Sequence, residues 1–293
     1  MPQPVDDDPF VTHRSLLFTV AYEMLGSAAD AEDVVQDTWL RWADVDKADV
    51  REARAYLVRI VTRQALNRLR TLARQREDFV GEWLPEPLLT SPDVAEDVEL
   101  ADSVSIAMLT VLETLGPTER AVFVLHEVFE TPYDEIAEAV GKTQAAVRQI
   151  AHRARERVAA RRPRMQLDKA VQEEALARFM EAVHTGEIGA LLGVLAPDVV
   201  MVSDGGGVAS AARKPLEGAQ KVAAFLMGLG RITPDFTASA VRINGALALV
   251  IEAPGQTATV MTATTADGRI TRIYAMRNPH KLGRIADETA LSR

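Results

Sequence analysis

The sequence predicts a multi-domain protein with two all-α units, the second containing a helix-turn-helix, followed by an α+β unit with a curved antiparallel sheet. Apolar residues recur at helical spacing through most of residues 10–162. Short β-favouring runs separated by turn signals fill most of the last third. A length of 293 residues suits more than one domain. We expect helical units over 1–75 and 100–162, a linker over 76–99 and the α+β unit over 163–293.

Composition excludes several classes of protein. The chain is 47% hydrophobic and 26% charged, which is typical of a globular protein. It has no cysteine, so disulfides, thiolate zinc sites and cysteine nucleophiles are excluded. No apolar run approaches the roughly 20 residues that span a membrane, and the acidic start MPQPVDDDPF is unlike a secretory signal. We therefore expect a cytoplasmic protein with no membrane partner and no cofactor.

The net charge of −9 disfavours DNA binding through overall charge. Neutralising phosphates requires local lysine and arginine, and the field of an acidic protein repels the duplex. Any contact with DNA should therefore use a local basic patch, with a larger partner supplying affinity.

The first helical unit contains an acidic helix and a basic helix. Ser27 followed by Asp30 resembles a capping box, and acids gather at the start of the helix that follows. The next helix, over 51–74, is apolar on one side; on its other side lie Arg59, Arg63, Arg68, Arg70 and Arg74. In the linker, glycine and prolines interrupt helix formation. Its run WLPEPLL (83–89) is too apolar for a free tether, so we expect it to dock.

The stretch VGKTQAAVRQIAHRARER (140–157) contains a Gly-Lys-Thr that has two interpretations. A phosphate-binding loop needs a glycine five positions before the Gly-Lys pair, but Ile136 stands there among helix formers. A helix-turn-helix fits better, because an apolar stripe over 133–140 is followed by Gly141 at the turn and Thr143 as a helix cap.

The second helix of this motif has a dry face and a wet face. On a helical wheel Val147, Ile150, Ala151, Ala154 and Val158 share one arc, whereas Gln144, Arg148, His152 and Arg155 share the adjoining arc with Gln149 beside them. Glutamine and arginine can form bidentate contacts with adenine and guanine. A solvated amphipathic helix has the same wheel, but the short helix, glycine and long helix together favour a DNA-reading helix.

The last unit is predicted from short β runs and turns. Helices are expected over 167–184 and 220–229, and strands over 199–202, 238–243, 246–252, 257–264 and 270–276. Asn244-Gly245, Pro254-Gly255 and Asp267-Gly268 separate the last four strands into an antiparallel meander. This order is typical of an α+β domain.

Three blocks resemble, in order, an extracytoplasmic-function (ECF) sigma factor of RNA polymerase. DAEDVVQDTWLRW (30–42) and AYLVRIVTRQALNRLR (55–70) resemble its σ2 domain, and the region from LGPTER (115–120) to RARER (153–157) resembles its σ4 domain. GEWLPEPLL (81–89), DGGG (204–207) and NPHKL (278–282) resemble the SigJ-like group, which carries a C-terminal SnoaL-like, NTF2-like domain. Val208 and His280 replace the lysine and aspartate that are usual in the last two motifs.

The resemblance implies contacts with core RNA polymerase and promoter DNA, and no enzymatic activity. σ2 would bind the β′ clamp helices through Asp30, Asp33, Gln36, Asp37 and Trp39, and σ4 would bind the β flap. σ2 would open and read the −10 element with Tyr56, Arg59, Arg63, Asn67 and Arg70. σ4 would read the −35 element with Lys142, Thr143, Gln144, Arg148, Gln149, His152, Arg153 and Arg155.

The resemblance also implies regulation in cis. We expect the C-terminal domain to pack on σ2, σ4 or the linker through Trp83, Leu84, Pro85, Asp204, Gly205, Gly206, Gly207, Asn278, Pro279, Lys281 and Leu282. One alternative is a helix-turn-helix regulator with a ligand-binding SnoaL-like domain. Another is an enzyme of that fold with a DNA-binding appendage, recognisable by two convergent polar groups in its pocket. Its base would come from His184, Asp198, Asp204, Asp235 or Glu252.

Overall fold

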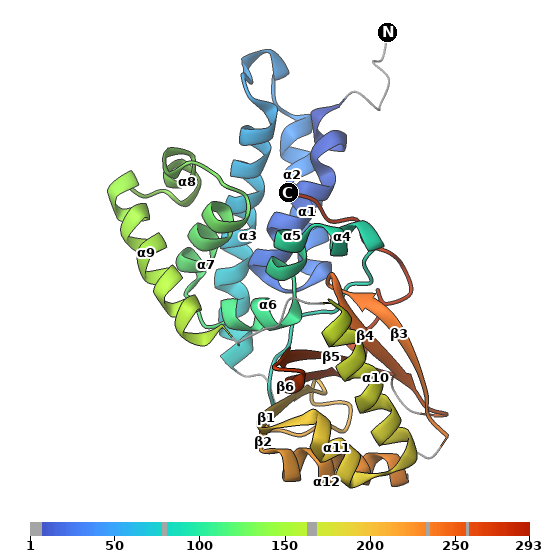
Figure 1. The fold of residues 1–293 in the computed structure, drawn as a ribbon. Helices are drawn as coiled ribbons and strands as arrows, with labels where there is room; N and C mark the ends of the chain where they lie inside the picture. The colour runs from blue at the N-terminus through green and yellow to red at the C-terminus, as the bar shows by residue number, and fades with distance from the viewer. Residues whose placement is uncertain (1–7, 78–80, 163–168, 233–234, 256–257) are drawn as a thin grey trace.

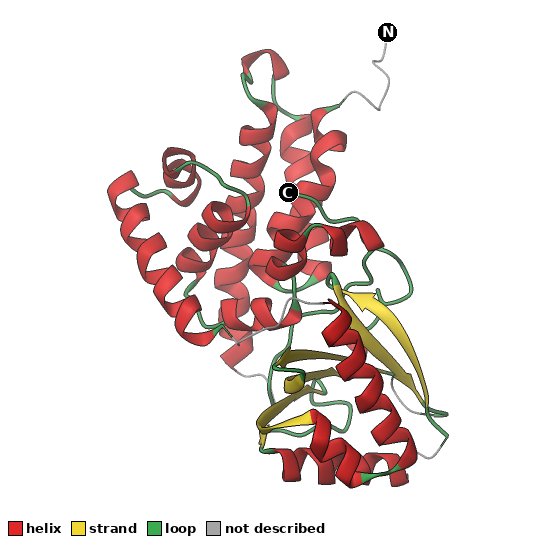
Figure 2. Cartoon of the chain, viewed as in Figure 1, coloured by secondary structure: helices red, strands yellow, loops and turns green. Residues whose placement is uncertain are grey.

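The computed structural model describes residues 8–77, 81–162, 169–232, 235–255 and 258–293, with an all-helical half and a half that contains the sheet (Figures 1 and 2). The predicted boundary at Pro163 and the apolar linker residues Phe79 and Val80 lie outside these ranges. Within the ranges, no helix is long and apolar enough to cross a membrane.

The first helical unit consists of α1 (Pro9–Leu25), α2 (Ala28–Ala43), a 3-10 turn (Lys47–Asp49) and α3 (Ala53–Glu77). Gly26 ends α1 in the left-handed conformation at φ 65°. Ser27 then begins α2 by accepting a hydrogen bond from the Asp30 amide, as predicted.

Helices resume earlier than the predicted end of the linker at residue 99. α4 (Pro92–Glu96) and α5 (Val98–Ser103) begin where we expected irregular chain. Local sequence explains both helices. Pro92 stands in the first turn of α4, where the backbone N–H that proline lacks has no intrahelical acceptor in any case. The Asp97 carboxylate caps α5 by accepting a hydrogen bond from the Leu100 amide at 3.0 Å.

The second helical unit continues with α6 (Ile106–Leu112), α7 (Pro117–Phe123), a π-helical turn (Val124–Val128), α8 (Tyr133–Val140) and α9 (Gln144–Arg161). The predicted helix-turn-helix is present. α8 ends at Gly141 with φ 67°, and the Thr143 hydroxyl caps α9 by accepting from the Ala146 amide. The predicted dry face is buried: Val147, Ile150, Ala151, Ala154 and Val158. These residues share one hydrophobic core with α1, α2 and α3, so the two helical units pack together.

The C-terminal α+β unit is confirmed, but its sheet is mixed. It comprises α10 (Lys169–Thr185), α11 (Ile188–Val194), β1 (Leu195–Asp204), β2 (Leu216–Glu217), α12 (Ala219–Ile232), β3 (Thr237–Ile243), β4 (Ala246–Glu252), β5 (Thr259–Ala266) and β6 (Arg269–Met276). The strand order is β2-β1-β6-β5-β4-β3. Strands β3 to β6 form the predicted meander, whereas β1 and β6 are parallel. Hairpin turns determine direction only between the strands they join, and β1 reaches the meander through α12.

Both faces of the sheet are covered. One face packs on α10, α11 and α12, with Met201 and Ile273 in that core. The other face packs Val202 and Tyr274 into a core that includes Leu84 of the linker. Successive strand residues point to opposite faces, so β1 and β6 connect the interior of the C-terminal unit with the linker.

The tip of the β3–β4 hairpin touches the helical half. Gly245 has φ 73°, and a Cβ at this position would lie 2.7 Å from the Cβ of Ala101 in α5. Gly268, at the tip of the β5–β6 hairpin, has a similar φ of 69°, but no atom lies within 4 Å of a Cβ built there. The two glycines therefore differ in contact and not in backbone conformation.

We predict that Gly245→Ala separates the hairpin from α5, whereas Gly268→Ala does not. Both changes strain a left-handed residue by about 1–2 kcal/mol, but only the first adds an overlap with Ala101. Small-angle X-ray scattering should give a larger radius of gyration for Gly245→Ala alone. An equal response of the two variants would contradict a role for the hairpin contact.

Candidate functional site

The residues predicted to read duplex DNA lie on the open face of the helix-turn-helix. All of them are exposed: Lys142, Thr143, Gln144, Arg148, Gln149, His152, Arg153 and Arg155. The Arg148 guanidinium lies 5.7 Å from the centre of the Tyr133 ring, and Arg155 pairs with Glu127 at 3.4 Å. The start of α9 therefore presents glutamine and arginine side chains to solvent.

The acidic face of α2 is open as well. Asp33, Gln36 and Asp37 are exposed, and Trp39 is 38% exposed although its ring centre lies 4.9 Å from that of Phe10. Asp30 is half-buried and accepts a hydrogen bond from Arg68 Nε at 2.7 Å. An exposed tryptophan next to carboxylates is a surface suited to a protein partner.

The basic face of α3 is partly covered by α8. The Arg59 guanidinium pairs with the Glu138 carboxylate at 2.8 Å. Arg63 donates from Nη2 to the Glu138 carbonyl at 2.7 Å and from Nε to the Ala139 carbonyl at 3.4 Å. These carbonyls lie in the last turn of α8, which lacks intrahelical donors for them and carries a partial negative charge.

The other residues predicted for the −10 contact differ in their surroundings. Tyr56 is half-buried, with its ring centre 5.9 Å from that of Trp42. Asn67 and Arg70 are exposed. The structure therefore brings Arg59 and Arg63 onto the helix-turn-helix and leaves Asn67 and Arg70 of α3 exposed.

The linker docks on α1 and α2 through Glu86, which the sequence pattern did not single out. Its Oε2 accepts a hydrogen bond from the Ala28 amide at 2.7 Å, so the carboxylate at the start of α2 comes from Glu86 and not from Asp30. Its carbonyl accepts from the Tyr22 hydroxyl at 2.6 Å. Burial raises the pKa of Glu86.

Asn244, in the β3–β4 turn, joins the C-terminal unit to the linker and to both helical units. It is fully buried, and its Nδ2 donates to the Tyr22 hydroxyl and to the Val104 carbonyl, each at 2.7 Å. Its Oδ1 accepts from the Leu88 amide at 2.9 Å. Asn-Gly predicted only a hairpin turn, because the partners of the side chain are distant in sequence.

Asp204 and Lys281 form a buried ion pair beside the linker. The Asp204 side chain is fully buried, and its Oδ2 lies 2.7 Å from Lys281 Nζ. The same Nζ donates to the Leu84 carbonyl at 2.5 Å and lies 3.9 Å from the centre of the Trp83 ring. Asp204 Oδ2 also accepts from the Leu84 amide at 3.0 Å. We call Asp204, Lys281, Trp83 and Leu84 the linker clamp.

The two motifs that supply the clamp pack on each other. Asp204 Oδ1 accepts from the Gly206 amide at 2.9 Å, and a Cβ at Gly206 would overlap the Asn278 side chain. Asn278 accepts from the His280 amide at 3.1 Å. The His280 side chain and Val208, the two departures from the usual motifs, are exposed and lie outside the clamp.

The C-terminal tail, residues 283–293, returns to the helical half (Figure 1). Ser15 Oγ donates to the Ala290 carbonyl at 2.9 Å, and the Ser292 amide donates to Thr19 Oγ1 at 3.0 Å. Leu291 is buried in the helical core. This docking was not predicted, because the tail carries no motif or periodicity.

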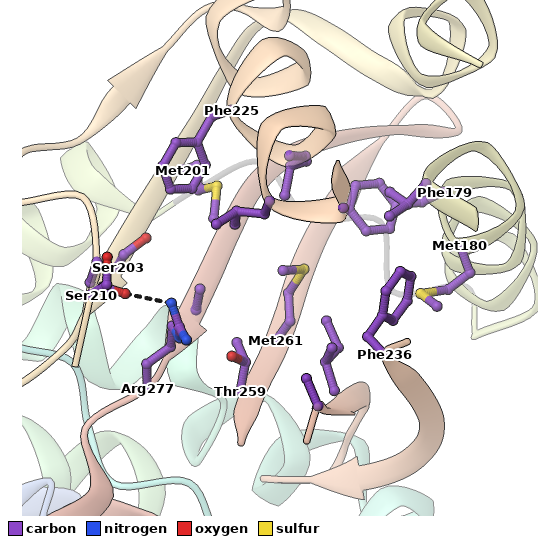
Figure 3. A pocket seen from close by; sticks show the side chains of 18 residues that line it. Phe179, Met180, Met201, Ser203, Ser210, Phe225, Phe236, Thr259, Met261 and Arg277 are labelled. Atoms are coloured by element: carbon purple, nitrogen blue, oxygen red, sulfur yellow. Dashed lines mark hydrogen bonds between the residues drawn. The ribbon is translucent and has the colours of Figure 1, made fainter. Parts of the chain in front are cut away.

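The C-terminal unit encloses an apolar pocket between its sheet and helices (Figure 3). Its polar lining residues are Ser203, Ser210, Thr259 and Arg277. None of the predicted base candidates lines it: His184, Asp198, Asp235 and Glu252 are exposed, and Asp204 faces the linker. Convergent polar groups are thus present, but the described lining has no carboxylate or imidazole to act as a base. In the same described residues, no His, Asp and Glu cluster could hold a metal.

Comparisons with known proteins match both helical units. Sigma-70 region 2 matches residues 10–75, and Sigma-70 region 4 matches residues 105–158. The ECF RNA polymerase sigma factor SigJ of Mycobacterium tuberculosis is 36% identical over an alignment of 286 residues, and the match covers 93% of this chain and 91% of that protein. The chain belongs to the ECF RNA polymerase sigma factors. Core RNA polymerase and promoter DNA are the partners that this family implies.

One solved structure agrees with this membership. The crystal structure of Mycobacterium tuberculosis SigJ matches this sigma factor with a TM-score of 0.75 and 33% identity, covering 93% of this chain and 96% of that one. A SnoaL-like protein of Burkholderia thailandensis, 19% identical, covers 36% of this chain and 93% of its own, with a TM-score of 0.30. Sigma factors are not enzymes, which excludes the alternative of an enzyme with a DNA-binding appendage.

A buried polar network joins α1 of σ2 to α5 and to α7 of σ4 in this sigma factor. Glu23 of α1 is fully buried, and its Oε1 lies 2.8 Å from Ser103 Oγ of α5. Arg120 of α7 donates from Nε to the Glu23 carbonyl at 2.9 Å and pairs with Glu113. Burial raises the pKa of Glu23 to about 8, an effect that the nearby Arg120 only partly offsets.

We predict that Glu23→Gln flattens the pH dependence of stability. Because the folded chain holds the Glu23 proton more tightly than the unfolded chain, stability is greatest below the ordinary glutamate pKa. It falls as pH rises toward 8, by up to about 1.4 kcal/mol per pH unit. Thermal melts between pH 5 and pH 8 should show this fall in the wild type and less of it in Glu23→Gln. Glu181→Gln, a change at an exposed position on α10, should melt like the wild type. If the stability of Glu23→Gln fell with pH as steeply as that of the wild type, Glu23 would not be the group responsible.

Proposed function

We propose that this ECF sigma factor directs core RNA polymerase to promoters and that its C-terminal domain inhibits it in cis. The acid-rich face of α2 would bind the β′ clamp helices and σ4 would bind the β flap. The basic face of α3 would open and read the −10 element, and α9 would read the −35 element. The open α2 and α9 faces support the first and last of these contacts.

The contact between α3 and α8 is the observation that supports the proposed inhibition. Arg59 and Arg63 touch Glu138 at 2.8 and 2.7 Å, so the surfaces for the two promoter elements lie in one compact body. The −10 and −35 elements lie roughly 25 base pairs, or about 85 Å, apart along the duplex. A compact chain of this length has a radius of gyration of only about 19 Å. σ2 and σ4 must therefore separate before both elements can be bound together.

The C-terminal domain supports the closed arrangement through the linker. Asn244 binds Leu88 of the linker and Tyr22 of σ2, and the linker clamp holds Leu84. A linker held along residues 84–88 cannot extend between separated domains. The division into 1–75, 76–99, 100–162 and 163–293 remains part of this proposal.

We predict that Lys281→Met raises transcription. Methionine keeps the length of the side chain but leaves the Asp204 charge buried without its ion pair, and such losses cost roughly 3–5 kcal/mol. Run-off transcription with core RNA polymerase should rise several-fold, and the radius of gyration should increase. Lys221→Met, at an exposed lysine on α12, should change neither quantity.

A second variant tests the same inhibition while keeping all four clamp residues. A chain truncated after Leu282 loses the tail contacts on α1 and should also give higher output. Circular dichroism will show whether each variant is folded. If folded, expanded variants gave unchanged or lower output, cis-inhibition would be wrong.

We predict that Arg148→Ala reduces transcription from promoters that depend on the −35 element and leaves polymerase binding intact. Loss of a bidentate base contact should cost about 1–3 kcal/mol, or roughly tenfold or more in promoter occupancy. Arg157→Ala, on the same helix, is the control, because Arg157 pairs with Glu119 at 2.6 Å. Loss of polymerase binding in Arg148→Ala would contradict the assignment. Tight promoter binding by the wild type without polymerase would favour the alternative of an autonomous helix-turn-helix regulator.

A further inference from the structure

The pocket of the C-terminal domain has a polar end and an apolar end. Figure 3 shows Ser203, Ser210 and Arg277 together on one side of the pocket and Phe179 and Phe236 on the opposite side. The cavity measures about 100 Å³, well above the roughly 10–15 Å³ that one water requires. It has room for a small organic molecule with one polar end.

The polar end carries hydrogen-bonding atoms that the described part of the chain leaves unsatisfied. Ser203 is only 4% exposed, and its Oγ has no partner there. Arg277 donates from Nη1 to the Ser210 carbonyl at 2.5 Å, but its buried Nε has no partner among the same residues. No described carboxylate pairs with Arg277, and burial lowers the pKa of its guanidinium. A half-buried cation without a described counter-charge favours an anion in the adjoining space.

We propose that this pocket binds a small amphipathic carboxylate, with its charged head on Arg277 and Ser203 and its apolar body against the phenylalanine side chains. The Nε–H and Nη–H of a guanidinium match the two oxygens of a carboxylate. The Ser203 hydroxyl adds a donor on the same side. Burial of the apolar body against aromatic walls supplies the remaining affinity.

The anchor residues adjoin the linker clamp on the same strands. Ser203 precedes Asp204 in β1, so the two side chains point to opposite faces of the sheet. Arg277 directly follows β6, and its amide donates to the Asp204 carbonyl at 2.7 Å. A carboxylate that binds Ser203 and Arg277 can therefore shift the backbone that positions Asp204. This coupling rests on the proposed function, in which the clamp holds the closed state.

Calorimetric titration of the full chain tests the site directly. The probes are 3-phenylpropanoate and straight-chain carboxylates of four to ten carbons, each paired with the alcohol of the same skeleton. We expect at least one acid to bind more tightly than its alcohol. Arg277→Met should weaken the acid about tenfold or more and leave the alcohol nearly unchanged, and Ser203→Ala should act in the same direction. Arg269→Met, at an exposed arginine of β6, should bind like the wild type.

Three outcomes overturn the site: no acid binds at millimolar concentration, acids and alcohols bind equally, or folded Arg277→Met binds acids like the wild type. Coupling is tested by reciprocity, since a ligand that acts on the clamp must have its own affinity changed when the clamp is broken. Lys281→Met should therefore shift the affinity for the acid, and the acid should change transcription by the wild type but not by Arg277→Met.

The two proposals fail separately. Absent acid binding, together with higher transcription from Lys281→Met, would overturn the pocket and leave cis-inhibition standing. Acid binding that is unaffected by Lys281→Met would support the site and overturn its coupling to the clamp. Acid binding together with unchanged transcription from expanded Lys281→Met would support the site and overturn cis-inhibition.

Discussion

The buried carboxylate of Asp204 is the constraint around which the closed arrangement is organised. A charge with no exposure is tolerated only when donors surround it, and here they are Lys281 Nζ, the Leu84 amide and the Gly206 amide. Leu84 belongs to the linker, whereas the other donors belong to the C-terminal domain. The carboxylate is therefore fully satisfied only while the linker lies across it. Such a pair adds little net stability over an apolar substitute, but losing one partner is costly, so it specifies one position of the linker.

The linker in turn depends on its neighbours for its backbone hydrogen bonds. Residues 84–88 are buried without being helical, so their backbone groups need partners elsewhere. σ2 accepts the Glu86 amide at Gly26, and the C-terminal domain accepts the Leu84 and Leu88 amides at Asp204 and Asn244. Removing the linker from one surface takes away the partners of the amides that pair there, while the bonds to the other surface remain. Full release of the linker must therefore break both sets of hydrogen bonds.

The sequence predicts the elements well where their cause is local. The dry face of α9 and the Asn-Gly turn follow from periodicity and backbone preference, and both are present. The interdomain contacts have no such cause: Asn244 and Tyr22 are 222 positions apart, and Glu86 and Ala28 are 58 apart. The parallel pairing of β1 with β6 likewise depends on a crossover that no turn signal records. The motifs at Asp204 and Lys281 were associated with each other only through a family resemblance, because their residue types alone are also typical of turns.

The contacts of the closed state differ in strength, and this difference determines what can open it. The Arg59–Glu138 pair is a surface pair, with side chains 34% and 66% exposed, and such pairs are worth about 0–1 kcal/mol. Arg63 faces the end of a helix, which carries only about half a unit charge, whereas a DNA phosphate carries a full one. In the proposed mechanism, DNA can therefore displace α8 from α3. It has no comparable access to the linker clamp, where the ion pair is buried on the Asp204 side and covered by Leu84 and Trp83. In the proposed mechanism the C-terminal domain, and not σ4, sets the free energy that polymerase or a pocket ligand must supply.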